Sequence, residues 1–519
     1  MKERMKKFMR AAVIVFFAVF AYGCTSKASD ALKTQETSDT ADNQTGKPTY
    51  GGEINVACIN EIDSLDPYAA VAAGTKEIMF NVFEGLVKYD FNGEIKPAIA
   101  ESYDISEDFK TYTFHIRKNI RFHNGQELTN KDIIFSLQKA INSATAASLK
   151  NIESVTEDGD TVIIQLNKPD NDFLAYLTAS FCAIIPDNYE DSAANPIGTG
   201  PFKLVSYDVQ QSLVLGKFKD YWNADSVYLD KVTFKIYSDE NSAYFDLLAG
   251  NLDLYPAVET EHYDEVKDKF NIVLGYRNIV QLLALNNAVE PFNNPKVREA
   301  LNYAIDKDQI IDVMSNGYGV KLGSSVIPGY KKYFNETVSG TYQYNQEKAK
   351  SLLKEAGYEG GFEFTVRVPS NYTFHVKTAE LIVAQLEQIG IKANIEQVEW
   401  GVWLDDVYQN RNFEATIIGL TGELSPKDWL SRYESTASNN FINYSSKAYD
   451  ELYANALKEM GEEQNIADYK ELQQILADDS ASVFIQDPQF LNVMDKNLAG
   501  YQVYPLYVQD MSTVYYIEQ

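Results

Sequence analysis

The four histidines of this 519-residue chain stand far apart and form no catalytic or metal-binding motif. His115, His123, His262 and His375 include no HExxH pair, and no GxSxG sequence supplies a serine nucleophile. The 74 acidic residues place carboxylates close together by chance, so such pairs do not indicate a glycosidase centre. We therefore expect no enzyme, no metal site and no cofactor.

Among the cysteines, only Cys24 stands where thiol chemistry is expected. Five basic residues between positions 2 and 10 precede an apolar run over 11–21, and Cys24 follows closely. The run is shorter than the roughly 20 residues that span a bilayer, which is typical of an export signal. A cysteine directly behind such a run resembles a bacterial lipobox, although Ala21 and Tyr22 depart from the usual pattern. That resemblance implies cleavage before Cys24 and lipidation of its thiol.

The other two cysteines, Cys58 and Cys182, lie in apolar segments typical of buried, unreactive thiols. The sequence leaves open whether a disulfide joins them. A polar stretch with almost no large aliphatic side chain follows Cys24 as far as Pro48, and such a composition cannot build a core. We expect it to form a flexible linker between the lipid and the folded part.

Acidic residues outnumber basic residues by 74 to 46, which gives a formal net charge of −28. A charge of this sign argues against nucleic acid or an anionic membrane surface as partner, and solubility is its simplest explanation. The length exceeds what one hydrophobic core normally serves, so we expect two or three domains.

The elements that would position a site are clearest over 92–141. Tyr112, Phe114 and Ile116 alternate with polar residues, which predicts a strand with one buried face. Asn124-Gly125 then predicts a turn, and Thr129 with Asp132 three residues later predicts a capping box that starts a helix.

This stretch also carries a resemblance. PAIAESYDISEDFKTYTFHIRKNIRFHNGQELTNKDIIFSL, at 97–137, is similar to extracellular solute-binding protein family 5, the oligopeptide-, dipeptide- and nickel-binding lipoproteins of ABC importers. The similarity continues through SLDP at 64–67, NVFEGLVKYD at 81–90, GTGPFKL at 198–204, NPKVREALNYAIDKDQII at 294–311 and YNQEKAKSLLKEAGY at 344–358. The number and order of these pieces, which cover nearly all of the chain beyond about Thr49, identify the family.

The resemblance implies an α/β chain with a two-lobed periplasmic-binding-protein-like fold of type II. That fold has an extra N-terminal subdomain and a ligand cleft between its lobes. The expected parts are a signal peptide at 1–23, a lipid-anchored flexible linker at 24–49, a discontinuous lobe I at 50–86, 195–281 and 493–519, an inserted subdomain at 87–194, and lobe II at 282–492.

The resemblance also implies a function. We expect a monomeric substrate-binding lipoprotein that captures di- or oligopeptides by hinge closure and delivers them to the transmembrane subunits of an ABC permease. It would sit on the extracytoplasmic face of the cell membrane, or in the periplasm if an outer membrane is present. Two alternatives remain: a binder of a nickel chelate or oligosaccharide with the same fold, and a peptide-sensing module without transport.

Peptide-binding relatives hold the ligand's ammonium group with an acidic residue in a stretch that here reads GLTGELSPKDW, from Gly419 to Trp429. The matching position is Glu423, next to Gly422. Glu423 replaces the usual Asp, and Leu420 stands where Trp is common, so the chain departs from the family pattern at two positions.

Aromatic residues near this stretch in sequence are further candidates. Trp400 and Trp403 offer large, rigid surfaces that suit varied ligand side chains, although core packing is the commoner fate of a tryptophan. Asn286 offers an amide at the end of an expected buried strand. Ala72 belongs to the small-residue loop that the resemblance places at the mouth of the cleft.

Along the rest of the chain, a helix is expected over 76–86 and another from Pro295, capped by Asn294. The glycine pair at 198–200 lacks the GK[ST] of a phosphate-binding loop, so we expect a turn or a crossover between domains there.

Overall fold

The computed structural model describes residues 46–59, 62–143, 147–422, 425–459, 461–506 and 508–518. The expected signal segment, Cys24 and most of the linker lie outside the described residues. The described chain is mixed α/β, as the sequence predicts. None of its helices combines the length and the apolar character that crossing a bilayer requires.

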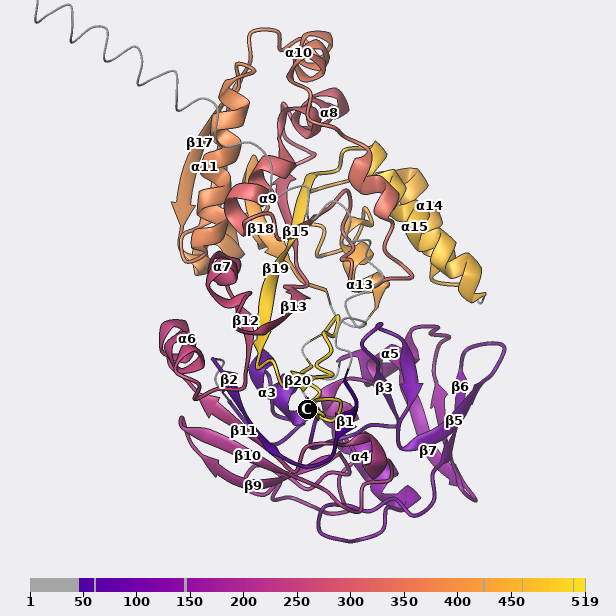
Figure 1. Cartoon of the computed structure of the whole chain (residues 1–519). Helices are drawn as coiled ribbons and strands as arrows, with labels where there is room; N and C mark the ends of the chain where they lie inside the picture. The colour runs from indigo at the N-terminus through magenta and orange to yellow at the C-terminus, as the bar shows by residue number, and fades with distance from the viewer. Residues whose placement is uncertain are drawn as a thin grey trace, which may run out of the picture. The chain divides into compact units, whose positions relative to one another are not determined.

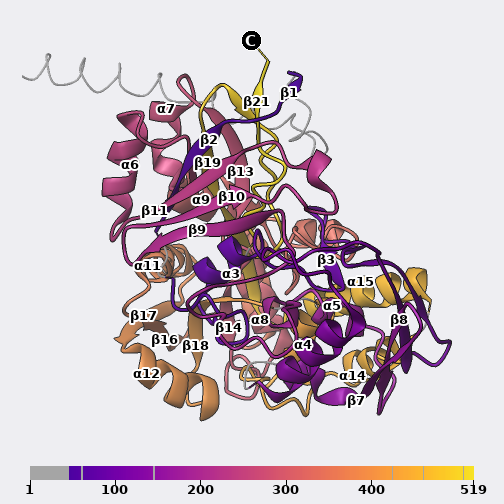
Figure 2. The ribbon, with the colours of Figure 1, turned by 90° about the horizontal axis from the view of Figure 1, so that it is seen from below.

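One large mixed sheet organises the described chain. Its second half-sheet is formed by β17 (Lys392–Val398), β16 (Glu363–Pro369), β18 (Ala415–Leu420), β14 (Val280–Leu285) and the short β15 (Gly319–Lys321). Its first half-sheet is formed by β12 (Leu254–Val258), β2 (Glu53–Cys58), β11 (Lys231–Ile236), β10 (Ser212–Lys217), β9 (Phe202–Asp208) and β13 (Asn271–Tyr276). Figure 2 shows β9, β10, β11 and β2 side by side.

A single long strand, β19 (Val483–Met494), joins the two half-sheets. Its first residues pair with β14, where Phe484 lies opposite Leu282. Its last residues pair with β12 and β13, where Met494 lies opposite Leu254 and Asn271. Figure 1 shows β19, in yellow, running from the strands of one half to those of the other.

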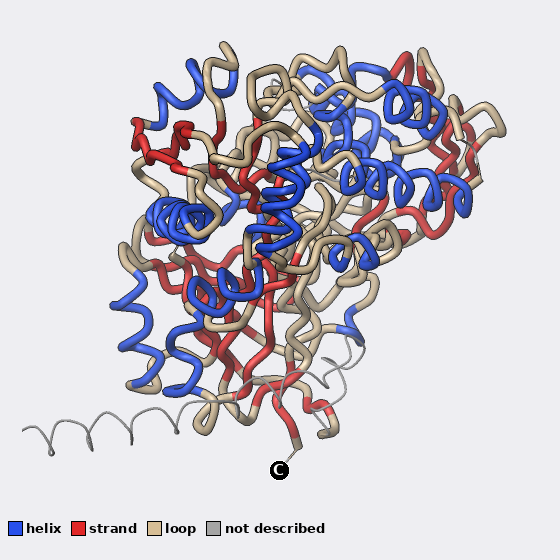
Figure 3. The backbone as a smooth tube through the Cα atoms, turned by 90° about the horizontal axis from the view of Figure 1, so that it is seen from above, coloured by secondary structure: helices blue, strands red, loops and turns tan. Residues whose placement is uncertain are grey.

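Helices cover the second half-sheet. The helix α11 (Thr373–Glu387) contacts β16, β17 and β18, and Figure 3 shows helices in blue beside strands in red. The others in this part of the chain are α8 (Pro295–Ala304), α9 (Lys307–Ser315), α10 (Gln346–Glu355), α12 (Trp400–Val402), α13 (Pro426–Leu430), α14 (Lys447–Ala456) and α15 (Glu462–Asp478). The Asn294 side chain caps α8 by accepting from the Lys296 amide at 3.0 Å, which confirms that predicted start.

The chain before β9 builds a four-stranded antiparallel sheet in the order β5 (Ala100–Ile105), β6 (Thr111–Ile116), β8 (Thr161–Leu166) and β7 (Ile152–Asp158). Tyr112, Phe114 and Ile116 point inward from β6, so the predicted alternation is confirmed. The helix α4 (Asn130–Asn142) starts at the predicted capping box, where Asp132 accepts from the Thr129 amide at 2.7 Å.

Two ends of the described chain meet. The strand β1 (Pro48–Thr49) pairs with β21 (Tyr515–Ile517), which pairs in turn with β20 (Leu498–Ala499). The remaining helices and strands are α3 (Ala73–Met79), β3 (Val87–Tyr89), β4 (Ile95–Pro97), α5 (Phe173–Tyr176), α6 (Glu240–Leu248) and α7 (Tyr263–Val266).

The helix predicted over 76–86 is wrong in its extent, because α3 ends at Met79. Beyond it, the carbonyl groups of Asn81 and Val82 accept hydrogen bonds from the amides of Phe202 and Gly200, each at 3.0 Å. These bonds to a distant segment replace the continuation of the helix.

The same contact explains the glycine pair at 198–200. A Cβ atom on Gly198 would lie 2.2 Å from the Val82 carbonyl oxygen, and one on Gly200 would lie 2.7 Å from that of Asn81. Glycine is therefore required because two backbones pack directly against each other. This is a bend with a close approach, consistent with the expected turn.

Candidate functional site

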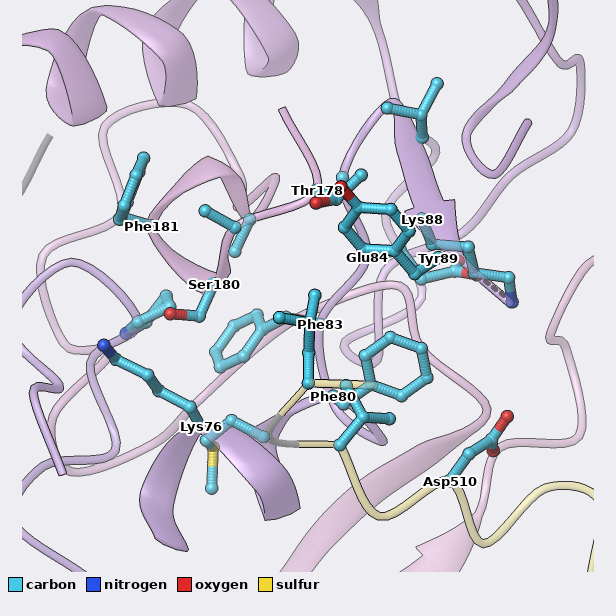
Figure 4. Close-up of a pocket in the computed structure, with 18 of the residues that line it drawn as sticks. Lys76, Phe80, Phe83, Glu84, Lys88, Tyr89, Thr178, Ser180, Phe181 and Asp510 are labelled. Carbon is cyan, nitrogen blue, oxygen red and sulfur yellow. Dashed lines mark ion pairs between the residues drawn. The ribbon is translucent and has the colours of Figure 1, made fainter. Parts of the chain in front are cut away.

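A cavity of about 250 Å³ lies beside α3. Its walls come from stretches that are distant in sequence: the 67–70 loop, α3 with the turn that follows it and β3, the 178–183 loop, Pro201, Gly422 and the 506–512 segment. The residues labelled in Figure 4 are Lys76, Phe80, Phe83, Glu84, Lys88, Tyr89, Thr178, Ser180, Phe181 and Asp510. Such a meeting of distant segments around a concave, largely apolar surface is typical of a ligand site.

The wall formed by α3 is fixed by Asn81, which lies just beyond the helix. Its side-chain amide donates to the Ile78 carbonyl at 3.0 Å and to the Gln509 carbonyl at 2.7 Å, and its oxygen accepts from the Met511 amide at 2.8 Å. Asn81 is completely buried. The helix and the 506–512 segment are therefore held together as two adjoining walls.

The carboxylate of Glu84 is buried at the cavity and already has several donors. It accepts from the Tyr221 hydroxyl at 2.7 Å, the Trp222 indole N–H at 3.1 Å and the Thr199 hydroxyl at 3.3 Å. The Lys88 ammonium lies 3.7 Å from the same carboxylate and forms an ion pair with it (Figure 4). A buried charge with this many partners is satisfied by the protein itself.

The second acid of the cavity, Asp510, is satisfied in the same way. One oxygen accepts from the Ser512 amide at 2.9 Å and from the Ser512 hydroxyl at 2.6 Å, and the other accepts from the Tyr504 hydroxyl at 2.9 Å. Neither carboxylate depends on a ligand for its hydrogen bonds.

Of the site residues predicted from sequence, Gly422 lines the cavity. A Cβ atom on Gly422 would lie 2.2 Å from the Trp429 ring, so glycine lets the backbone rest on the indole. Trp429 is itself almost completely buried. Glu423, the predicted ammonium-binding residue, lies outside the described residues.

Trp400 and Trp403 lie together but do not line this cavity. Their rings stack with centroids 5.2 Å apart and planes 6° from parallel. Trp403 is 2% exposed, and its indole N–H donates to the Thr416 hydroxyl at 2.9 Å. Trp400 also packs edge-on against Tyr372, with centroids 5.4 Å apart.

Asn286 is buried, and its side chain bonds to neighbouring protein groups. The amide donates to the Arg411 and Phe413 carbonyls at 3.1 and 2.8 Å. Its oxygen accepts from the Asn443 amide group at 2.9 Å.

Ala72 belongs to the loop before α3, whose Ala70 lines the cavity. The Asp63 carboxylate accepts from the Val71 and Ala72 amides at 2.8 and 3.0 Å and from the Thr75 hydroxyl at 2.6 Å. Burial by itself raises the pKa of Asp63, but these hydrogen bonds outweigh it and hold the pKa below its usual range. The loop backbone is thus fixed by one ionised carboxylate.

The buried histidines and cysteines are not among the residues that line this cavity. Burial lowers the pKa of His123 and of His375 to about 4, so both rings are neutral at pH 7. Cys58 and Cys182 are both buried and no disulfide joins them, which answers the question left open by the sequence.

The cavity residues that sequence reasoning missed include those of the 178–183 loop, those of the 506–512 segment and the aromatic side chains after α3. The helical spacing of Lys76 and Phe80, four residues apart, was a usable signal for a shared face. Nothing in the local sequence connects Asn81 with residues more than 400 positions later.

Comparison with known proteins places the whole architecture. Residues 94–441 match the model of the bacterial extracellular solute-binding proteins, family 5 (middle region). Heme-binding protein A of Haemophilus influenzae is 31% identical over 440 residues, covering 76% of this chain and 79% of that protein. Oligopeptide-binding protein AppA of Bacillus subtilis is 26% identical and covers 97% of each chain.

A solved structure supports the same assignment. The periplasmic binding protein DppA from Helicobacter pylori, in complex with the peptide STSA, is similar with a TM-score of 0.69 and 28% identity, covering 91% of this chain and 99% of that one. The two-lobed α/β binding-protein fold expected from the sequence is thereby confirmed. The chain belongs to the bacterial extracellular solute-binding proteins of family 5.

Proposed function

We propose that this protein captures di- or oligopeptides outside the cytoplasm and delivers them to the transmembrane subunits of an ABC permease. Family 5 proteins are extracytoplasmic binding components of ABC transport rather than enzymes. Relatives named for peptide binding match this chain over most or nearly all of its length.

The observation that carries the proposal is the cavity beside α3. It brings Gly422, from the stretch expected to hold a peptide's ammonium group, against α3 and Ala70, from the loop expected at the cleft mouth. A ligand seated there would contact segments that belong to different half-sheets. Ligand contacts with both sides are what favour a closed form over an open one.

The backbone connections suit such closure. The two half-sheets are linked through the long strand β19 and through the short 277–279 connection between β13 and β14. A small number of crossing strands confines the change in backbone angles to a few residues. We also propose that the domain boundaries lie at 86/87, 194/195, 281/282 and 492/493.

The proposed location is the outer face of the cell membrane, with Cys24 lipidated and the polar stretch after it as a tether. Two or more acyl chains give stable anchoring, whereas one gives only marginal binding. Mass spectrometry of membrane-extracted protein tests this: the mature chain should begin at Cys24 with a lipid mass, and Cys24→Ala should abolish both.

The ligand is tested first by native mass spectrometry of the purified protein, which should release peptides on mild denaturation. The ammonium anchor is tested by Glu423→Gln. Because the carboxylate would pair with a charged amine, this variant should bind a free-amine peptide about tenfold more weakly and an N-acetylated peptide unchanged.

Glu380→Gln, on the exposed face of α11, is the matched control and should alter neither affinity. An equal loss for both peptides would remove Glu423 from the anchor role. A protein that binds no peptide at all, but binds nickel–histidine or an oligosaccharide, would replace the peptide proposal with the corresponding alternative.

A further inference from the structure

We propose that the cavity beside α3 binds the C-terminal residue of a peptide, with an aromatic side chain inside the cavity and the terminal carboxylate on Lys76. This inference rests on the proposed peptide-binding function and names the ligand group that this cavity selects. It is based on which charged side chains around the apolar chamber already have partners and which do not.

The apolar character of the chamber comes mainly from aromatic and aliphatic side chains. Those that line it are Met79, Phe80, Phe83, Phe181, Leu506 and Val508. Phe80 already packs on Tyr504 with ring centroids 5.7 Å apart and planes tilted by 58°, a geometry that aromatic pairs favour. A further ring entering this chamber gains contact area and loses few rotatable bonds.

Among the described residues that line the cavity, no carboxylate is free to bind a ligand cation. Glu84 and Asp510 are the acids that line the cavity, and both accept hydrogen bonds from hydroxyl and N–H donors of the protein. A ligand ammonium group would have to displace those donors, and each donor would then be buried without a partner. The cavity therefore disfavours lysine or arginine side chains.

A ligand anion does find a partner. Of the two lysines that line the cavity, Lys88 is paired with Glu84 at 3.7 Å. Lys76 is half-buried, and it forms no ion pair with any residue in the part of the chain that the structure describes. It lies in α3 one turn before Phe80, and Figure 4 shows its ammonium group on the Ser180 side of the cavity.

The size of the chamber limits what it holds. At about 250 Å³ it is smaller than the roughly 300–1,000 Å³ typical of sites for drug-sized ligands. It therefore suits one aromatic side chain with its carboxylate and not a macrocycle. Haem also carries carboxylates on a flat ring, and it serves as the comparison ligand because a relative is named for binding it.

The test is calorimetric titration of the purified full chain with Ala-Ala-Phe, its C-terminal amide and Ala-Ala-Lys. We expect Ala-Ala-Phe to bind about tenfold more tightly than the amide, the effect of one charge-assisted hydrogen bond, and more tightly than Ala-Ala-Lys. Lys76→Met should bring the acid to the affinity of the amide, while Lys76→Arg should keep the preference. Lys377→Met, which removes an exposed lysine from α11, should also keep it.

Ser180→Asp provides an independent variant, because it adds a negative charge to the cavity wall while residue 76 stays lysine. It should weaken Ala-Ala-Phe more than the amide. Equal binding of acid and amide by the unmodified protein, or an unchanged preference in Lys76→Met, would overturn the inference while leaving peptide binding intact. If haem bound the protein and its affinity fell in Lys76→Met, haem would occupy the cavity, and the size limit would be overturned. Failure of every peptide to bind would instead reject the proposed function.

Discussion

Glu84 is a buried carboxylate whose hydrogen-bond partners are donors. Both its charge and its shape therefore matter for the stability of the fold. In Glu84→Gln an amide N–H group would face the hydroxyl of Tyr221 or Thr199 and the indole N–H of Trp222. Two opposed donors leave at least one buried group unsatisfied, so we expect a loss of about 1–3 kcal/mol in the free energy of unfolding. Urea denaturation followed by circular dichroism measures it.

The exposed Glu380→Gln serves again as the reference and should change the free energy of unfolding by less than about 0.5 kcal/mol. If both variants were equally stable, Glu84 would not be held by its donors as described.

The carboxyl group of Asp487, in β19, should make the free energy of unfolding depend on pH. Burial raises the pKa of its carboxyl well above the usual value of 3.8, although the Ile279 amide donates to it at 3.3 Å. The folded protein therefore keeps a proton that the unfolded chain releases above about pH 4, so this group lowers stability as pH rises from there. Asp487→Asn removes that loss.

The stability of Asp487→Asn relative to the unmodified protein should consequently increase between about pH 5 and about pH 8, as measured by urea denaturation at each pH. A constant difference across that interval would mean that Asp487 is ionised in the folded protein.

At the scale of residues, the sequence predicts partners that are close along the chain and misses those that are distant. Thr129 and Asp132 are three residues apart, and their capping box was predicted and is present. Glu84 and Tyr221 are 137 residues apart, and no local pattern connects them. For Trp403 and Asn286 the sequence supplied suitable chemistry, but the direction of each side chain depends on strands that pair only in the folded protein.

At the scale of elements, the close approach of two backbones at Gly198 gives a sharp prediction. A methyl group there would lie 2.2 Å from the Val82 carbonyl oxygen, so Gly198→Ala should lower the free energy of unfolding by about 1–3 kcal/mol. Gly401→Ala is the contrast, because Gly401 lies in α12 with nothing within 4 Å of the added Cβ atom. It should raise stability by up to about 1 kcal/mol. Thermal unfolding of both variants checks the pair.

Helices and strands whose ends depend on neighbouring residues in the sequence were predicted well. The strand β6 follows its alternation, and α8 begins where Asn294 caps it and Pro295 opens it. The predicted extent of the helix over 76–86 was wrong because a distant segment sets its end. The carbonyl groups beyond Met79 accept hydrogen bonds from amides of the 198–202 segment. A helical pattern continues in the sequence after the backbone has left the helix.

At the scale of the whole molecule, hinge closure predicts a change in shape on binding. If a peptide contacts both half-sheets, its binding should lower the radius of gyration measured by small-angle scattering. Tryptophan emission should change as well. The Lys76→Met variant with Ala-Ala-Phe should need more peptide to reach the same end state. Unchanged scattering with saturating peptide would contradict closure.

The shared strand β19 also has a consequence for how the protein is made. It comes late in the chain, at residues 483–494, yet it pairs with β14 in one half-sheet and with β12 and β13 in the other. A ribosome delivers the chain from its N-terminus, so neither half-sheet can be completed until almost the entire polypeptide has been synthesised. Such a delay keeps the nascent chain unfolded for longer, which is the state that a secretion channel accepts.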